Sequence, residues 1–143
     1  MLNSAIKKRN LFLDYQSGSR LVYGINDSLP GLIVDKYKKY ILIQINTAGI
    51  DRFRDLVKSV LTNAFSTHEV VFYDNVEYRK AEILPIHNKE GIEQDLEVEE
   101  NELKYKIPKS VMQKIGYYYD HRENRARIKN LLSRINISKE NGL

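Results

Sequence analysis

Cysteine is absent from this chain of 143 residues. Without a thiol there is no disulfide framework, no cysteine–zinc site and no thiolate that attacks a substrate. Long apolar runs are missing too, because no stretch approaches the roughly 18 consecutive apolar residues of a membrane span. Residues 1–13 lack the apolar segment and small-residue cleavage site of a signal peptide. These absences predict a cytoplasmic protein with no membrane partner.

Common nucleotide and metal motifs are missing as well. Neither G-x-G-x-x-G nor G-x-x-x-x-G-K-[ST] occurs, and the 7 glycines are scattered, so a complete nucleotide-binding turn is absent. His68, His87 and His121 have no histidine three or four residues away, so we expect no metal centre. No serine stands in the sequence context of a hydrolase nucleophile.

The composition is that of a globular chain, with 42% hydrophobic and 29% charged residues. Its length allows one ordinary domain, or a domain with a piece of another. The net charge of +4 is compatible with a polyanionic partner without requiring one. The charges are unevenly distributed. Residues 82–103 hold eight acidic residues and one lysine, whereas residues 104–134 hold nine basic and two acidic residues.

Strand and helix patterns predict an α+β fold. We expect a small mixed or antiparallel sheet with one main packed helix, a C-terminal hairpin and a trailing helix. Three strands are predicted between Arg20 and Ile45, separated by turn residues, and a fourth at Glu69–Tyr73. Tyr78–Ile83 is predicted as a short helix or turn. The main helix is expected to begin with Asp51 as its cap and to bury one apolar face, formed by Phe53, Leu56, Val57, Val60, Leu61 and Ala64.

Residues 96–107 are predicted to form a hairpin with Asn101-Glu102 as its loop. This register places Leu96, Val98 and two glutamates opposite favourable partners, the pairs being Glu99 with Lys104, Val98 with Tyr105, Glu97 with Lys106 and Leu96 with Ile107. The reversal from acidic to basic residues is therefore in part a device for pairing strands.

The most distinctive segment is Gln113–Arg125, which contains three successive tyrosines between Gly116 and Asp120. Aromatic faces beside fixed cations suit a heteroaromatic ring with an anionic group. The alternative is a buried aromatic strand followed by a solvated basic helix. Asp120 and Glu123 predict the start of that helix, which carries Ile128, Leu131, Leu132 and Ile135 on one face and the basic stripe Arg122, Arg125 and Lys129 on another.

Two segments resemble a known family. Gln113–Arg125 is similar to a "QKTGFFLDQRxNR" signature, and Arg20–Tyr37 is similar to "RLVHGExDGLPGLIVDRY". Both belong to bacterial class I S-adenosylmethionine (SAM)-dependent methyltransferases that make 5-methylcytosine in large-subunit ribosomal RNA. Residues 98–103 also resemble the family's "xEENGL" hairpin. Ile115, His121, Lys38-Lys39 and Glu102 depart from the family pattern.

The resemblance implies a PUA RNA-binding domain, a central α+β domain and a Rossmann-like catalytic domain. On this basis residues 1–19 are expected to be a linker or helix, 20–108 the central domain, and 109–143 the lead-in to the catalytic domain. The cofactor-binding residues implied by the resemblance are Gln113, Lys114, Gly116, Tyr118, Asp120, Arg122 and Arg125. The resemblance implies Arg79 as an RNA-binding residue, and the basic helix adds Lys129 and Arg134 as predicted RNA-binding residues.

The expected function is that of a fragment of an RNA methyltransferase that is inactive alone. Methylation at cytosine C5 typically needs a cysteine thiolate that adds to C6, and this chain has none. Two alternatives stay open. In the first alternative, the chain is a stand-alone RNA-binding module that uses the basic helix and the tyrosines. In the second, it is a dimerisation domain that associates with another copy.

Overall fold

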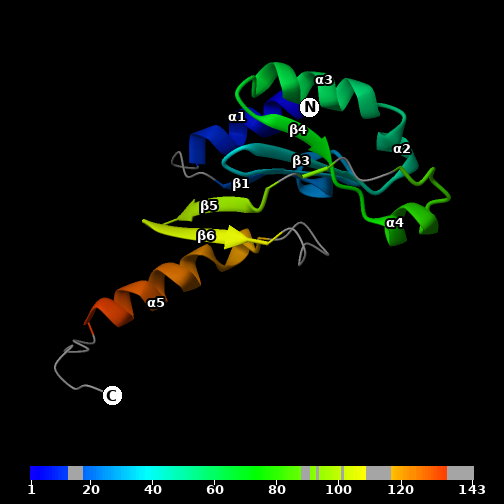
Figure 1. The fold of residues 1–143 in the computed structure, drawn as a ribbon. Helices are drawn as coiled ribbons and strands as arrows, with labels where there is room; N and C mark the ends of the chain where they lie inside the picture. Colours follow the sequence, from blue (N-terminus) through cyan, green and yellow to red (C-terminus); the bar gives the residue numbers. More distant parts are fainter. Residues whose placement is uncertain (13–17, 88–90, 93, 101, 109–116, 135–143) are drawn as a thin grey trace.

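A computed structural model describes residues 1–12, 18–87, 91–92, 94–100, 102–108 and 117–134 (Figure 1). The fold is α+β, as predicted. Its centre is a four-stranded sheet of order β1-β2-β3-β4, formed by β1 (Ser19–Tyr23), β2 (Leu32–Lys36), β3 (Tyr40–Ile45) and β4 (Glu69–Phe72). The first three strands pair antiparallel, whereas β4 runs parallel to β3. A parallel neighbour needs a crossover, which α2 (Ala48–Asp51) and α3 (Arg54–Ala64) provide.

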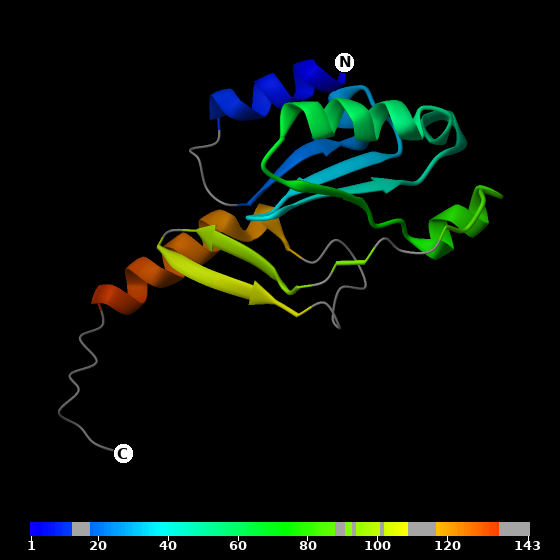
Figure 2. The same ribbon diagram turned by 45° about the horizontal axis from the view of Figure 1, so that its top comes forward.

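One face of the sheet is covered by helices. Helix α1 (Leu2–Phe12) and α3 lie together over it, and they contribute Ala5, Ile6, Val57 and Leu61 to a core cluster with the strands (Figure 2). Because Ala5 and Ile6 are buried in this cluster, the start of the chain packs against the central sheet.

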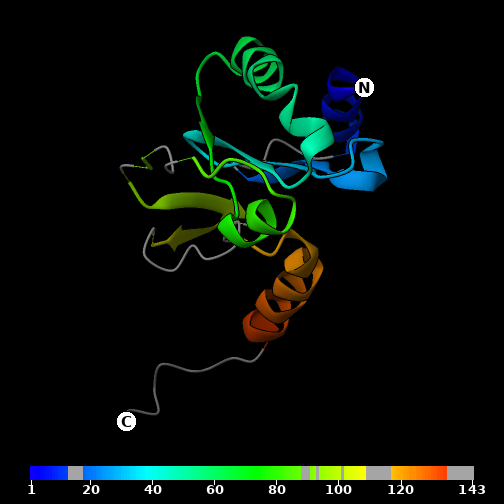
Figure 3. The same cartoon turned by 90° about the vertical axis from the view of Figure 1, so that its right-hand side faces the viewer.

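The other face carries a second core beneath a two-stranded sheet. Strands β5 (Leu96–Glu100) and β6 (Leu103–Ile107) form the predicted hairpin in the predicted register. Its Leu96 and Val98 pack with Tyr37, Leu42 and Tyr117 from the rest of the chain. Helices α4 (Val76–Ala81) and α5 (Arg122–Arg134) lie on this side too (Figure 3). The central sheet therefore separates two apolar clusters.

The main helix differs from its prediction. Helix α3 begins at Arg54 after the separate turn α2, and Asp51 does not cap it. Val57 and Leu61 are buried, but Phe53 and Leu56 are 55% and 60% exposed. Arg54 places its guanidinium 3.6 Å from the centre of the Phe72 ring and 2.7 Å from the Asp74 carboxylate. Helix α3 buries fewer side chains than its apolar pattern predicts. A short helix packed on a sheet buries only the side chains that point directly at the sheet, here Val57 and Leu61.

One charged pair that faces across the hairpin, as predicted, has its ion partners elsewhere. Glu97 and Lys106 are register partners, yet Glu97 pairs with Lys38 at 3.0 Å and Lys106 with Asp95 at 3.6 Å. In the part of the chain that the structure describes, no helix is long and apolar enough to cross a membrane.

Candidate functional site

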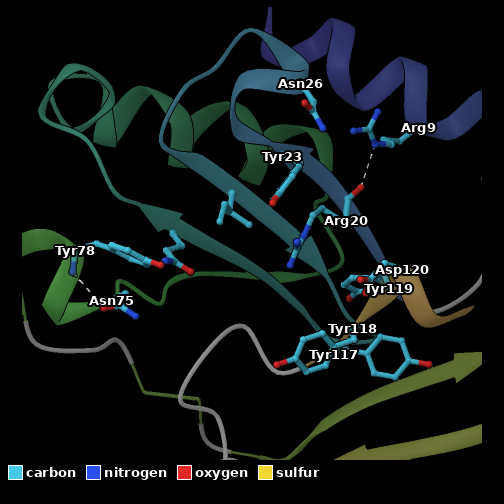
Figure 4. A pocket seen from close by; sticks show the side chains of 12 residues that line it. Arg9, Arg20, Tyr23, Asn26, Asn75, Tyr78, Tyr117, Tyr118, Tyr119 and Asp120 are labelled. Carbon is cyan, nitrogen blue, oxygen red and sulfur yellow. Dashed lines mark hydrogen bonds between the residues drawn. The ribbon is translucent and has the colours of Figure 1, made fainter.

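A cavity of about 600 Å³ opens on the part of the sheet that the hairpin leaves uncovered (Figure 4). Its size is typical of sites for small ligands. The lining residues come from α1, β1, the 3-10 turn η1 (Gly24–Asp27), β2, β3, α4 with its cap, and the segment before α5. They are Arg9, Arg20, Tyr23, Asn26, Ile33, Gln44, Asn75, Tyr78, Tyr117, Tyr118, Tyr119 and Asp120. The cavity therefore joins residues that lie as much as 111 positions apart in the sequence.

The two segments that resemble the methyltransferase family meet at this cavity. The first contributes Arg20 and Tyr23, and the second contributes Tyr118 and Asp120. Arg20 and Tyr23 are three positions apart, so a regular strand would direct them to opposite faces. The pairing of β1 with β2 shifts register between Arg20 and Val22, and such a bulge turns both side chains to one face.

Arg20 is held at the cavity by a buried carboxylate. Its Nε and Nη2 donate to the two oxygens of Asp35 at 2.8 and 3.0 Å. Burial raises the pKa of Asp35 to about 6, and the hydrogen bonds and charge of Arg20 oppose this shift. At neutral pH the two groups form a bidentate ion pair. The guanidinium also lies 5.1 Å from the Tyr23 ring centre and 5.9 Å from that of Tyr119.

The three successive tyrosines have different surroundings. Tyr117 is buried, Tyr119 is half-buried, and Tyr118 is 64% exposed. The Tyr117 and Tyr119 rings meet edge to face with centres 5.1 Å apart, and their hydroxyls donate to Glu100 and to the Lys36 carbonyl. The tyrosines do not form the strand expected as the alternative, since Tyr119 begins the 3-10 turn η3 (Tyr119–His121), but the burial that it expected holds for Tyr117 and in part for Tyr119, which also border the cavity. Tyr118 is the one with a face open to a ligand.

The basic stripe of α5 faces the hairpin, whereas the alternative interpretation expected a solvated basic helix. The side chain of Glu100 is fully buried, and it accepts from Arg125 at 2.9 and 3.0 Å and from Arg122 at 3.2 Å. Arg122 also donates to the Gly18 carbonyl, while Arg125 lies 4.4 Å from the Tyr117 ring centre. These arginines, which the resemblance assigns to cofactor binding, fix α5 to the hairpin.

The charge on Glu100 is maintained by these contacts. Removal from water raises the pKa of this carboxyl, but the hydrogen bonds from Arg125, Tyr117 and Arg122 outweigh that effect and lower the pKa below its ordinary value. Burial, together with the bond to Glu100, raises the pKa of the Tyr117 hydroxyl, which therefore remains a donor.

Arg79 also proves to be an internal residue, which does not fit the RNA contact predicted for it. Its side chain is 1% exposed and donates to the Pro85 carbonyl at 2.7 Å and to both oxygens of Asp51 at 2.9 and 3.2 Å. These hydrogen bonds hold the pKa of Asp51 below its ordinary value. Arg79 thus anchors α4, and the neighbouring Tyr78 lines the cavity.

The remaining predicted residues have diverse positions. Lys129 forms an ion pair with Glu102 at 2.7 Å. Gln113, Lys114 and Gly116 lie outside the described residues, and Arg134 is the last residue of α5. Within the described ranges, no group of three or more histidine, cysteine or acidic residues is placed to hold a metal ion.

Several cavity residues were not predicted from the sequence. Tyr23 comes from β1, Gln44 from β3, and Tyr78 and Asn75 from α4 and its cap, so only the fold brings them together. Tyr23 gave one local signal, since it is an aromatic residue that follows the apolar pair Leu21-Val22 at the end of its strand.

Comparisons with known proteins point in one direction. The chain is 35% identical over 115 residues to Ribosomal RNA large subunit methyltransferase I of Shewanella amazonensis, which covers 77% of this chain and 29% of that protein. It is 30% identical over 133 residues to the protein of the same name in Aliivibrio fischeri, covering 88% of this chain and 33% of the relative. The chain therefore spans about a third of the length of these relatives.

The solved structures that match share the fold at low identity. A candidate methyltransferase, SMU.776, solved in complex with SAH, superposes with a TM-score of 0.67 at 16% identity, over 90% of this chain and 33% of that one. A candidate SAM-dependent methyltransferase from Streptococcus mutans superposes with a TM-score of 0.62 at 18% identity, over 90% of this chain and 36% of that one. No family model matches the sequence. The described fold is thus one that also occurs as part of larger chains.

Proposed function

We propose that this chain is the central segment of a SAM-dependent methyltransferase that modifies large-subunit ribosomal RNA, with cytosine C5 as the acceptor atom. One observation carries the proposal: the two segments that resemble that family, far apart in the sequence, line one cavity. Tyr118 and Asp120 are both exposed at the cavity, which a role of these segments in the core alone would not require.

The described residues make only part of a cofactor site. Tyr118 and Asp120 offer an aromatic face and a carboxylate, but Arg122 and Arg125 are bound to Glu100. No thiol is available for attack on C6 of cytosine. We therefore assign cofactor binding and the nucleophile to the parts of such an enzyme outside the matched third, and we expect no methyl transfer by this chain alone.

A chimaera tests the proposal. In the Shewanella amazonensis relative, the matched segment is replaced by the corresponding residues of this chain, and methyl transfer from labelled SAM to large-subunit ribosomal RNA is measured. We expect transfer by the chimaera and a reduced rate when it carries Tyr118→Ala. Asp55→Asn, on the exposed side of α3, is the matched control.

The result is interpretable only if the chimaera is folded. Its melting temperature and its SAH binding are therefore compared with those of the parent enzyme. A chimaera that equals the parent in both and still transfers no methyl group contradicts the proposal. Calorimetric titration of the chain itself with SAM supplies a second test, because micromolar binding would contradict the assignment of the cofactor site to other parts.

A second candidate, a dimerisation module, is favoured by one feature of α5. Ile128, Leu131 and Leu132 are 56%, 58% and 54% exposed, and together they form an apolar face. Such a face fits a second copy of the chain or a neighbouring domain, and the two are separated by the oligomeric state in solution.

A further inference from the structure

Three exposed tyrosines surround the cavity, each from a different element. Tyr23 ends β1, Tyr78 lies on α4 and Tyr118 precedes α5, with 47%, 53% and 64% of each residue exposed (Figure 4). A single exposed aromatic residue needs no explanation. Three that border one cavity form a surface on which flat rings can stack, since stacking on aromatic side chains is how proteins hold unpaired bases.

The charges of the cavity favour an uncharged ring over a phosphate. Arg20 is paired with Asp35, and the Nη2 of Arg9 lies 2.8 Å from Asp27. Both cations are therefore largely neutralised by a carboxylate of their own. Phosphate sites depend on uncompensated arginine or lysine charge, which is what makes backbone binding sensitive to salt.

Polar groups at the rim of the cavity can form hydrogen bonds with the edge of a base. The carboxylate of Asp120 is 77% exposed, and its nearest ion partner is His121 at 3.9 Å. Asn75 uses its Oδ1 to accept from the backbone of Glu77 and Tyr78. Its amide nitrogen is a donor of a kind that complements ring nitrogen or carbonyl acceptors. A carboxylate accepts from the exocyclic amine of a base, as aspartate and glutamate do with cytosine N4.

Helix α4 presents Tyr78 on a firm support. The neighbouring Arg79 is bonded to Asp51, to the Pro85 carbonyl and to the Ile45 carbonyl at 3.5 Å. Asn75 caps the same helix. Because α4 has only six residues, these anchors rather than helix propensity fix the position of its tyrosine.

From these observations we propose that the cavity binds an unstacked nucleobase of single-stranded RNA. Tyr78 and Tyr118 provide the stacking faces, and Asp120 accepts a hydrogen bond from an exocyclic amine of the base. The inference rests on the proposed function for the identity of the ligand as RNA. The adenine of SAM is also a flat heteroaromatic ring with an exocyclic amine, so the experiment must separate the two sources.

Short labelled RNA strands test the site by fluorescence anisotropy. Hexacytidylate and hexauridylate carry equal backbone charge, but only cytosine has the exocyclic amine. We expect hexacytidylate to bind the chain more tightly by about fivefold or more. Tyr78→Ala and Tyr118→Ala should each weaken hexacytidylate binding by about fivefold or more, whereas Tyr118→Phe should retain it. Phe53→Ala, an exposed aromatic on the helical side, is the matched control.

Asp120→Asn tests whether the carboxylate of Asp120 accepts a hydrogen bond from the exocyclic amine of the base. We expect it to abolish the difference between the two strands, whereas Asp55→Asn should preserve it. Melting curves of every variant establish that it is folded. Equal binding of both strands by the original chain, or tyrosine variants that bind hexacytidylate as the original does, would overturn the inference.

SAH distinguishes the second source of the ring. If SAH displaces the labelled strand and Tyr118→Ala weakens SAH binding, the cavity takes the adenine of the cofactor and the inference is overturned. RNA binding that weakens steeply with salt and is unchanged in the tyrosine variants would also overturn the inference, because the chain would then hold the phosphate backbone of the RNA at another site. Binding of SAH at the cavity would also contradict the assignment of the cofactor site to other parts of the enzyme, whereas the proposed methyl transfer is tested separately by the chimaera.

Discussion

At the scale of single residues, buried charge decides more than the local sequence indicates. Arg79 reads as a surface residue on a short polar helix, yet it is 0% exposed. Its partners Asp51 and Ile45 are 28 and 34 positions away in the sequence. No local pattern could have predicted these contacts, because the acceptors come together only when β3, α2 and α4 are assembled.

Replacement of Arg79 by alanine should lower the free energy of unfolding by about 3 kcal/mol, since it removes a buried cation that pairs with Asp51 and Asp74 and leaves these carboxylates to Arg54. Urea unfolding at pH 7 measures this loss. Lys80→Ala, at the exposed neighbouring position, is the control and should change the stability by less than about 0.5 kcal/mol. A loss below about 1 kcal/mol for Arg79→Ala would contradict the anchoring role.

Ile83 is strained in a way that a single substitution can relieve. It follows α4 with a φ of 56°, a left-handed conformation that a β-branched residue rarely adopts, and it is 93% exposed. Ile83→Gly should therefore raise the free energy of unfolding by about 1 kcal/mol. Ile86→Gly is the control, because Ile86 is exposed at ordinary φ and its replacement should not stabilise the chain. Thermal melts of both variants measure the difference, and equal effects would argue against strain at Ile83.

At the scale of elements, patterns within one segment were predicted well and contacts between segments were not. The hairpin register followed from the charges and apolar residues of β5 and β6 themselves. The direction in which the arginines of α5 point did not follow from the sequence of the helix, because it is set by Glu100, which lies 22 residues before Arg122. A basic stripe is ordinarily solvated, and only a buried carboxylate beneath it reverses that expectation.

The clamp between Glu100 and α5 predicts a pH dependence of stability. Because the pKa of Glu100 is lower in the folded chain than in the unfolded one, its contribution is complete above the ordinary glutamate pKa and declines as the pH falls below it. Glu100→Gln should cost about 2 kcal/mol at pH 7. The difference from the original chain should narrow toward pH 3, as thermal melts across this range would reveal. A difference that stays constant with pH would rule out an ionised Glu100 as the cause.

At the scale of the whole molecule, the sequence was enough to predict the class of fold but not the cavity. The four strands, the hairpin and the trailing helix each have a local signature. The cavity has none, because a bulge in β1, an anchored α4 and the segment before α5 must all be placed before its lining exists. Of the residues predicted for the cofactor, Tyr118 and Asp120 reach it, while Arg122 and Arg125 bind Glu100.

The apolar face of α5 predicts how the chain behaves in solution. Replacement of both Leu131 and Leu132 by glutamine should reduce concentration-dependent association measured by light scattering, because both residues are more than half exposed. The melting temperature of the dilute protein should hardly change, since surface substitutions usually have small effects. Association that is equal in the variant would exclude this face as the contact between copies.

The division of the apolar interior by the central sheet has a consequence for amide hydrogen exchange. An isolated two-stranded hairpin is only marginally stable, so β5 and β6 owe their order to the second core and to the Glu100 clamp. The hairpin and α5 should therefore open together as one cooperative unit while β1–β4 remain closed. The amides of the hairpin and α5 should exchange through this partial opening, at a lower free energy than the amides of β2 and β3. Glu100→Gln should accelerate exchange in the hairpin and α5 alone.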